Sequence, residues 1–141
     1  MLQRIQTVWL LLALACLIAF IALPFGALTI SADGVEAVGQ LFAYDFIGLI
    51  IPAALAVILS LIAIFAYGNL GFQKSCVLLS IAMTLVSIGI TVYILCDRAT
   101  EGTISWTWCG AFILGALLFE ILALAGINHD IKLLRSYDRL R

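Results

Sequence analysis

Glu120 is the only acidic or basic residue inside the four long apolar stretches of this 141-residue sequence. It lies about seven residues before the predicted end of the last stretch, roughly 10 Å from that boundary at 1.5 Å per residue. A carboxyl group in this position has a functional interpretation, which is a proton or cation site. It also has a structural one, a neutral acid hydrogen-bonded to another helix, and the residue by itself favours the structural interpretation.

Four hydroxyl side chains provide candidate partners for Glu120, and they share the third apolar stretch. Their spacing of four, three and four residues puts them on one face of a helix: Ser80, Thr84, Ser87 and Thr91. Counted from the helix end, Ser80 and Thr84 come closest to the depth of Glu120. Such a stripe can line a wet path, but it more often joins helices at about 1 kcal/mol or less per bond. The sequence leaves both interpretations open.

The four cysteines divide into two kinds. Cys96 and Cys109 flank one loop, so they form a candidate disulfide if that loop lies in an oxidising compartment. The depth of Cys109 in its helix speaks against the bond. Cys16 and Cys76 are expected to be small apolar packing residues.

Catalytic signals are weak along the whole sequence. His129 is the one histidine, without a recognisable nucleophile beside it, and no pair of cysteines has metal-ligand spacing. The glycines lack the Lys-Ser/Thr arrangement of a phosphate-binding loop, and no motif for nucleic-acid binding occurs. We therefore expect no enzyme activity, no cofactor, no metal and no nucleic-acid partner.

The amino-acid composition indicates whether the chain lies in water or in a lipid bilayer. Hydrophobic residues make up 65% of the sequence and charged residues 11%, far from the roughly 45–50% and about 25% of soluble domains. A small soluble domain has too little interior to hide so much apolar surface. The lipid bilayer is the expected partner of most of the chain.

Four stretches are long enough to cross a hydrocarbon core, which takes about 20 residues as a helix. They predict helices over about 7–28, 46–67, 75–96 and 104–127, with a tail over 128–141. The expected fold is an all-α, four-transmembrane-helix antiparallel bundle in one domain, residues 1–141. A cleaved signal peptide is an alternative for the first stretch, but its apolar run exceeds the usual signal core of about 7–15 residues.

The cations predict the orientation of the spans. Only Arg98 falls on one side, and the other side holds Arg4, Lys74, Lys132, Arg135, Arg139 and Arg141. By the positive-inside rule both termini should be cytoplasmic. On the outer side, residues 29–45 are the longest connection, which allows either a short strand pair or a surface-lying helix.

The C-terminal tail has the pattern of an amphipathic helix. Its apolar residues occupy one arc, its cations another, and Asn128 is a candidate cap for a helix that restarts after Gly126. Asp130, Asp138 and the terminal carboxylate offset most of its positive charge, so we expect only modest attraction to anionic lipid. A sided helix of this kind suits docking to a protein, and the candidate docking residues at the two chain ends are Arg4, Lys132, Arg135, Asp138, Arg139 and Arg141.

The two chain ends, residues 1–13 and 130–141, resemble those of a small four-span inner-membrane family of Bacteroidota, a domain-of-unknown-function family. The matching residues are Gln3-Arg4-Ile5-Gln6, Asp130, Lys132, Leu133, Arg135-Ser136 and Asp138-Arg139-Leu140-Arg141. The sequence departs from the family pattern at Asn128-His129 and Ile131, and the middle of the chain matches only in hydropathy. The resemblance implies a bacterial inner-membrane protein with cytoplasmic termini, and it offers no catalytic residue.

Two functions follow as expectations from these features. The leading one is a non-enzymatic accessory or scaffold subunit, which docks a membrane-protein partner or a second copy through its cytoplasmic ends. The alternative is a small proton-coupled transporter or channel that uses Glu120 with the hydroxyl stripe of Ser80, Thr84, Ser87 and Thr91.

Overall fold

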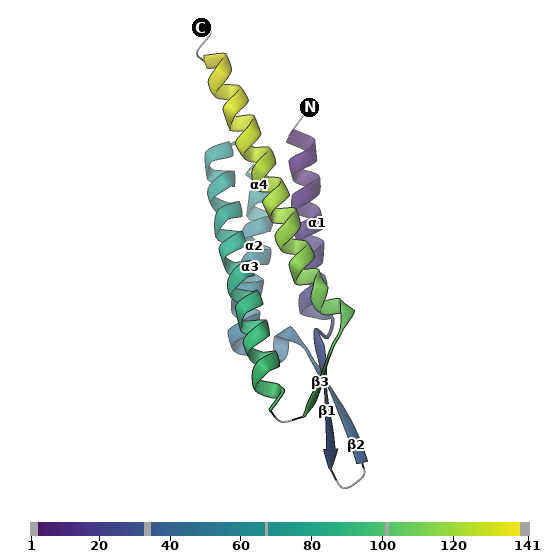
Figure 1. The fold of residues 1–141 in the computed structure, drawn as a ribbon. Helices are drawn as coiled ribbons and strands as arrows, with labels where there is room; N and C mark the ends of the chain where they lie inside the picture. Colours follow the sequence, from purple (N-terminus) through teal and green to yellow (C-terminus); the bar gives the residue numbers. More distant parts are fainter. Residues whose placement is uncertain (1–2, 33–34, 67, 101, 139–141) are drawn as a thin grey trace.

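The computed structural model describes residues 3–32, 35–66, 68–100 and 102–138, and four helices dominate it (Figure 1). These are α1 (Gln3–Ala22), α2 (Ile47–Phe65), α3 (Leu70–Arg98) and α4 (Ala111–Asp138). Within these ranges all four are long and apolar enough to cross a membrane. These helices confirm the expected four-helix bundle.

The helices form a closed ring in which each packs against two neighbours. α1 contacts α2 and α4, and α3 contacts α2 and α4, so α2 and α4 face each other across the diagonal. Both described chain ends and the α2–α3 turn lie at one end of the bundle (Figure 1), which we call the terminal end. We call the opposite end, where the strands project beyond the helices, the sheet end.

Three short strands form the sheet end: β1 (Gly26–Ala32), β2 (Val35–Leu41) and β3 (Thr103–Trp106). They are antiparallel in the order β2-β1-β3, with Gly26 opposite both Leu41 and Trp106. The sequence allowed a strand pair in the first connection, and the structure contains that pair. The third strand was not predicted, since four residues with no alternating pattern give little signal.

Two predicted helix boundaries are wrong at the sheet end. α1 ends at Ala22 rather than near residue 28, because Pro24 cannot donate to a helix and the chain turns there into β1. α4 begins at Ala111 rather than near residue 104, because residues 103–106 pair with β1 and a short 3-10 helix (η2, Trp108–Gly110) follows them.

The restart of the tail helix at Asn128 is also wrong, because α4 continues without a break to Asp138. Gly126 does not end the helix: it lies against α1, where an added Cβ would come within 2.9 Å of Gln6 Cγ. Ile127 is fully buried on the same side. Packing against α1 therefore holds this segment helical where local sequence signals favour a stop.

The interior consists of three apolar clusters along the bundle axis. Phe20, Phe25 and Ile113 belong to the cluster at the sheet end, Leu17 and Ala116 to the middle cluster, and a third cluster around Leu10, Ala123 and Ile127 fills the terminal end. Between the last two lies a polar layer, which contains the candidate site.

We predict that Gly102→Ala weakens the pairing of β3 with β1. An added Cβ would lie 2.6 Å from the Thr29 backbone carbonyl oxygen, and a strand backbone cannot yield as a flexible side chain can. We expect a loss of about 1–3 kcal/mol, typical of overpacking, measured by thermal unfolding in detergent. Gly48→Ala is the matched control, because no atom lies within 4 Å of the added Cβ. Equal stability of the two variants would contradict the assigned contact.

Candidate functional site

The polar layer joins three helices around the carboxyl group of Glu120. We call Ser60, Ser80, Thr84 and Glu120 the Glu120 cage; all four side chains are fully buried. Ser80 Oγ donates to Glu120 Oε1 at 2.5 Å, and Ser60 Oγ lies 3.4 Å from the same oxygen. The two serine hydroxyls are 2.9 Å apart. Three oxygens thus form a compact triangle in the interior.

Three of the four helices contribute side chains to the cage, each from a different side. Ser60 lies on α2, Ser80 and Thr84 lie on α3, and Glu120 lies on α4. Because α2 and α4 are diagonal partners, the contact between Ser60 and Glu120 spans the centre of the bundle. A long acidic side chain and small facing residues make that reach possible.

Two polar atoms of the cage have no hydrogen-bond partner among the residues that the structure describes. They are Glu120 Oε2 and Thr84 Oγ1, although the Thr84 side chain lies close enough to the Glu120 carboxyl group to interact with it. Unsatisfied buried polar atoms are rare in folded proteins, and each one calls for a physical reason such as a bound water or ion. A proton on Glu120 Oε2 would supply such a reason, because the neutral acid can donate a hydrogen bond to the Thr84 hydroxyl.

The hydroxyl stripe of α3 divides into two parts. Ser80 and Thr84 belong to the cage, whereas Ser87 donates to the Met83 carbonyl oxygen at 3.0 Å and Thr91 to that of Ser87 at 2.8 Å. Bonds of this kind, within one helix, are common for Ser and Thr. Ser87 and Thr91 are thus buried on the same face of α3 as the cage residues, but their hydroxyls are engaged within their own helix.

A second polar contact closes the terminal end. The Gln6 side-chain amide on α1 donates to Asp130 Oδ2 on α4, and both side chains are buried, Asp130 with 8% exposed. His129 Nδ1 lies 3.8 Å from the other carboxylate oxygen. This contact anchors α4 to α1 at the point where α4 leaves the bundle.

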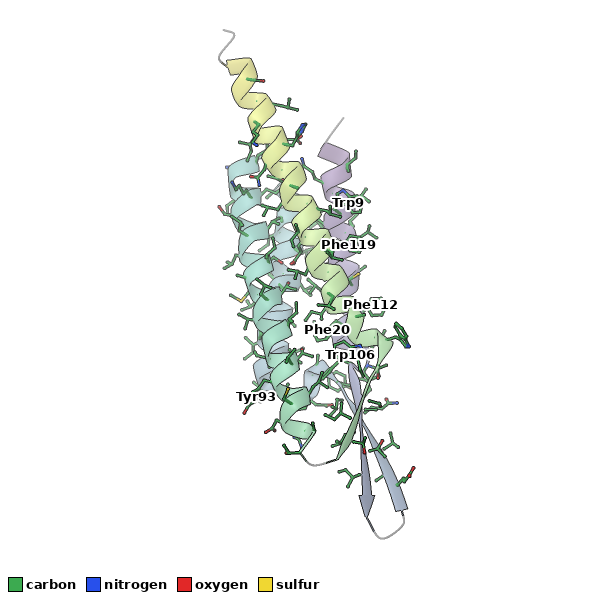
Figure 2. The ribbon with its side chains drawn as sticks, viewed as in Figure 1. Trp9, Phe20, Tyr93, Trp106, Phe112 and Phe119 are labelled. Carbon is green, nitrogen blue, oxygen red and sulfur yellow. The ribbon has the colours of Figure 1, made fainter. Side chains whose placement is uncertain are left out.

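A shallow cavity of about 230 Å³ opens beside this contact. It is lined by Ile5, Gln6, Trp9, Gly126, His129 and Asp130. Trp9 stacks on Phe119 with ring centroids 5.8 Å apart, so aromatic packing joins α1 to α4 just below it (Figure 2).

The predicted docking residues lie partly outside the described residues. Lys132 is exposed on α4 beyond the Gln6–Asp130 contact. The side chains of Arg4, Arg135 and Asp138 and the whole of Arg139 and Arg141 are outside the part of the chain that the structure describes.

The candidate disulfide between Cys96 and Cys109 is absent: both are free thiols. Cys96 is exposed in the last turns of α3, and Cys109 lies in η2 at the foot of α4. The chain between the two cysteines forms β3, which pairs with β1. It is therefore not the short closed loop that a disulfide between these positions would require. Cys76 is buried and Cys16 is half-buried.

Sequence reasoning missed three residues of these sites. Ser60 stands out in the sequence only as a small residue for helix packing, although its depth in the second span matches that of Glu120. Gln6 and Asp130 belong to opposite chain ends, and nothing in their spacing shows that they meet, because 124 positions separate them. Among the described residues no group of three or more His, Cys, Asp or Glu could hold a metal ion.

Comparison with known proteins adds one relationship. A family model described as "Domain of unknown function (DUF4293)" matches residues 2–140, which is almost the whole chain. No curated protein matches.

We predict that Asp130→Ala destabilises the bundle by about 1–3 kcal/mol, because it leaves the buried Gln6 amide without its acceptor. The double variant Gln6→Leu/Asp130→Leu should recover most of that loss, since removing both partners leaves no unpaired group. Thermal unfolding in detergent measures both effects. Asp97→Ala, at an exposed position on α3, is the control. A double variant as unstable as the single one would contradict the assigned pairing.

Proposed function

We propose that this chain, which belongs to the DUF4293 family of domains of unknown function, is a non-enzymatic accessory or scaffold subunit of a membrane assembly. It docks a membrane-protein partner or a second copy through its terminal end. One observation carries the proposal: α4 continues beyond the other helices (Figure 1) and is anchored to α1 by the buried Gln6–Asp130 contact. The projecting segment is thus a rigid helix, which loses little conformational entropy on binding.

The membrane in question is the bacterial inner membrane, with both termini in the cytoplasm. Lys74 and Lys132 belong to the terminal end, whereas Arg98 is in the last turn of α3 at the sheet end. Counted along the sequence, every Lys and Arg except Arg98 falls on the terminal side, which supports this orientation under the positive-inside rule. The resemblance of the chain ends to a family of Bacteroidota supports the bacterial location.

The projecting part of α4 has the mixed chemistry of a docking surface. Leu133 and Leu134 are exposed, Leu134 by 55%, and the exposed Lys132 precedes them. Ile131 turns the other way and packs against the apolar cluster of the terminal end. Apolar residues that the bundle itself leaves uncovered, beside a cation, suit a helix that binds a partner.

We predict that Leu134→Ala reduces recovery of the bound partner about fivefold or more, as for an interface residue that contributes upward of 1 kcal/mol. The measurement is cross-linking in native membranes, followed by quantitative mass spectrometry of the purified complex. Leu118→Ala is the matched control, because Leu118 is also an exposed leucine of α4, at 62%, but lies next to Phe119, in the part of α4 that packs against α1 within the bundle. If both variants recover the same partners at wild-type levels, the projecting helix is not the docking element.

A second candidate is proton-coupled transport, for which the Glu120 cage provides the specific observation. Glu120 is fully buried, and one of its oxygens has no partner among the described residues. Buried acids inside membrane spans commonly mark proton and ion pathways. α3 carries buried polar residues toward both ends from the cage, with Gln73 on one side and Ser87 and Thr91 on the other. These side chains would form a polar route along which protons could move through the bundle.

We predict for this candidate that Glu120→Gln lowers proton flux into proteoliposomes about tenfold or more, because an amide cannot release a proton. An imposed pH gradient and an internal pH-sensitive dye provide the measurement. Ser75→Ala should leave the flux unchanged, since Ser75 is an exposed serine of α3 outside this route and its hydroxyl donates to the Gly71 carbonyl oxygen. Equal flux through the wild type and the Glu120→Gln variant would leave the acid a purely structural role.

A further inference from the structure

The cavity at the terminal end contains an acid whose charge the described side chains do not fully offset. Asp130 is 8% exposed, and its one hydrogen bond within the described residues comes from the neutral amide of Gln6. Its one ion-pair contact among them is with His129, at 3.8 Å, and that histidine is charged only when protonated. A buried carboxylate is stable when it is both hydrogen-bonded and paired with a cation. The cavity beside Asp130 is therefore a place for a positively charged group.

The size and the lining of the cavity suit a small organic cation. Its volume of about 230 Å³ is below the roughly 300–1,000 Å³ of pockets for drug-sized ligands. Trp9 lines it, and stacking on Phe119 fixes the orientation of the Trp9 ring (Figure 2). An aromatic face attracts an ammonium group, and a carboxylate accepts its N–H bonds. Trp9 and Asp130 together thus provide the two contacts that recognise an organic ammonium.

The cavity also lies at the level of the lipid headgroups. Ile5, which lines it, is the first residue of the apolar span of α1 and is 55% exposed. On the other helix of the cavity, the His129 side chain is 62% exposed. Tryptophan at the end of a span, as at Trp9, is typical of the membrane–water interface. A ligand in this cavity can thus place a polar group against Asp130 and an acyl chain along α1.

We infer that this cavity binds a primary ammonium group, presented by the headgroup of a phosphatidylethanolamine lipid. The positive charge of the ammonium group offsets that of the Asp130 carboxylate, and its three N–H bonds find an acceptor there. The phosphate of the same headgroup lies toward the exposed His129, which can donate to it. The zwitterionic headgroup therefore matches an acid and a hydrogen-bond donor that lie side by side.

Two other abundant headgroup types fit the cavity less well. A trimethylated ammonium, as in phosphatidylcholine, has no N–H to donate and is recognised by cages of several aromatic rings. Among the described residues, Trp9 is the only Trp, Tyr or Phe that lines the cavity. The headgroup of phosphatidylglycerol has a net negative charge and no amine, so Asp130 would repel it.

This inference is independent of both proposed functions. Glu120 lies ten residues before Asp130 on α4, about 15 Å away along the helix at 1.5 Å per residue, and Leu134 does not line the cavity. Lipid selectivity is measured on the purified chain without a partner and without a proton gradient. Failure of this inference and failure of docking or transport are therefore distinguishable.

The experiment is native mass spectrometry of the whole purified chain in detergent. The chain is mixed with equimolar phosphatidylethanolamine, phosphatidylcholine and phosphatidylglycerol that carry the same acyl chains. We expect about one phosphatidylethanolamine per chain, retained about fivefold or more over each of the other two lipids. Soluble phosphoethanolamine, added at the same concentration, should displace little of it, because it lacks the acyl chains that pack along α1.

Asp130→Asn should lower the preference for phosphatidylethanolamine about tenfold. The asparagine keeps an oxygen that accepts from Gln6 but removes the negative charge. Trp9→Phe keeps a ring that can stack on Phe119 and weakens the attraction for ammonium, so we expect a loss of about threefold. Asp97→Asn is the matched control, because Asp97 is an exposed acid of α3 outside the cavity. Its lipid preference should equal that of the wild type.

Equal retention of the three lipids by the wild type overturns the inference, and this result does not require any variant to fold. A preference that persists undiminished in both Asp130→Asn and Trp9→Phe also overturns it, since the lipid would then bind elsewhere. If phosphoethanolamine displaces the lipid at equal concentration, the ligand is a soluble amine, and the assignment to a lipid headgroup is wrong.

Discussion

The absence of water from the bilayer core is the constraint on which the rest of the structure depends. Backbone groups satisfy it by forming helices, but polar side chains must find partners inside the bundle. Among the described residues, the two buried acids meet this demand differently. Asp130 pairs with a single amide donor from α1, Gln6, at the end of the bundle. Glu120 accepts hydrogen bonds from hydroxyls of α2 and α3 in the interior, and its second oxygen has no partner among the described residues.

These two contacts also set the relation between the helices. α1 and α4 are joined by aromatic stacking of Trp9 on Phe119, by the close approach at Gly126 and by the Gln6–Asp130 bond. The cage ties α4 to its other neighbour and to the helix across the diagonal. α4 is therefore bonded to all three other helices. These contacts hold its base in place where it continues as one helix past the end of the bundle.

The sheet end and the terminal end therefore have different characters. At the sheet end, buried Phe20 and Phe25 close the interior, and β1 links the first connection to the last through backbone bonds. At the terminal end, the Gln6–Asp130 bond closes the interior. Beyond it, the surface of α4 that carries Leu134 is exposed. The two ends thus differ in how their interiors are closed, by aromatic packing at the sheet end and by a polar pair at the terminal end.

The sequence by itself determined the four spans and the bundle, because the bilayer selects long uninterrupted apolar stretches and hydropathy records them directly. It also identified Glu120 with Ser80 and Thr84 as one polar group, since helical spacing conveys depth and face. Only the tertiary structure decided that Ser60 joins them, that Asp130 meets Gln6 and that residues 103–106 form a strand. Those outcomes depend on which helices lie adjacent and how they rotate, and local residue patterns carry no record of partners that are 60 or 124 positions away.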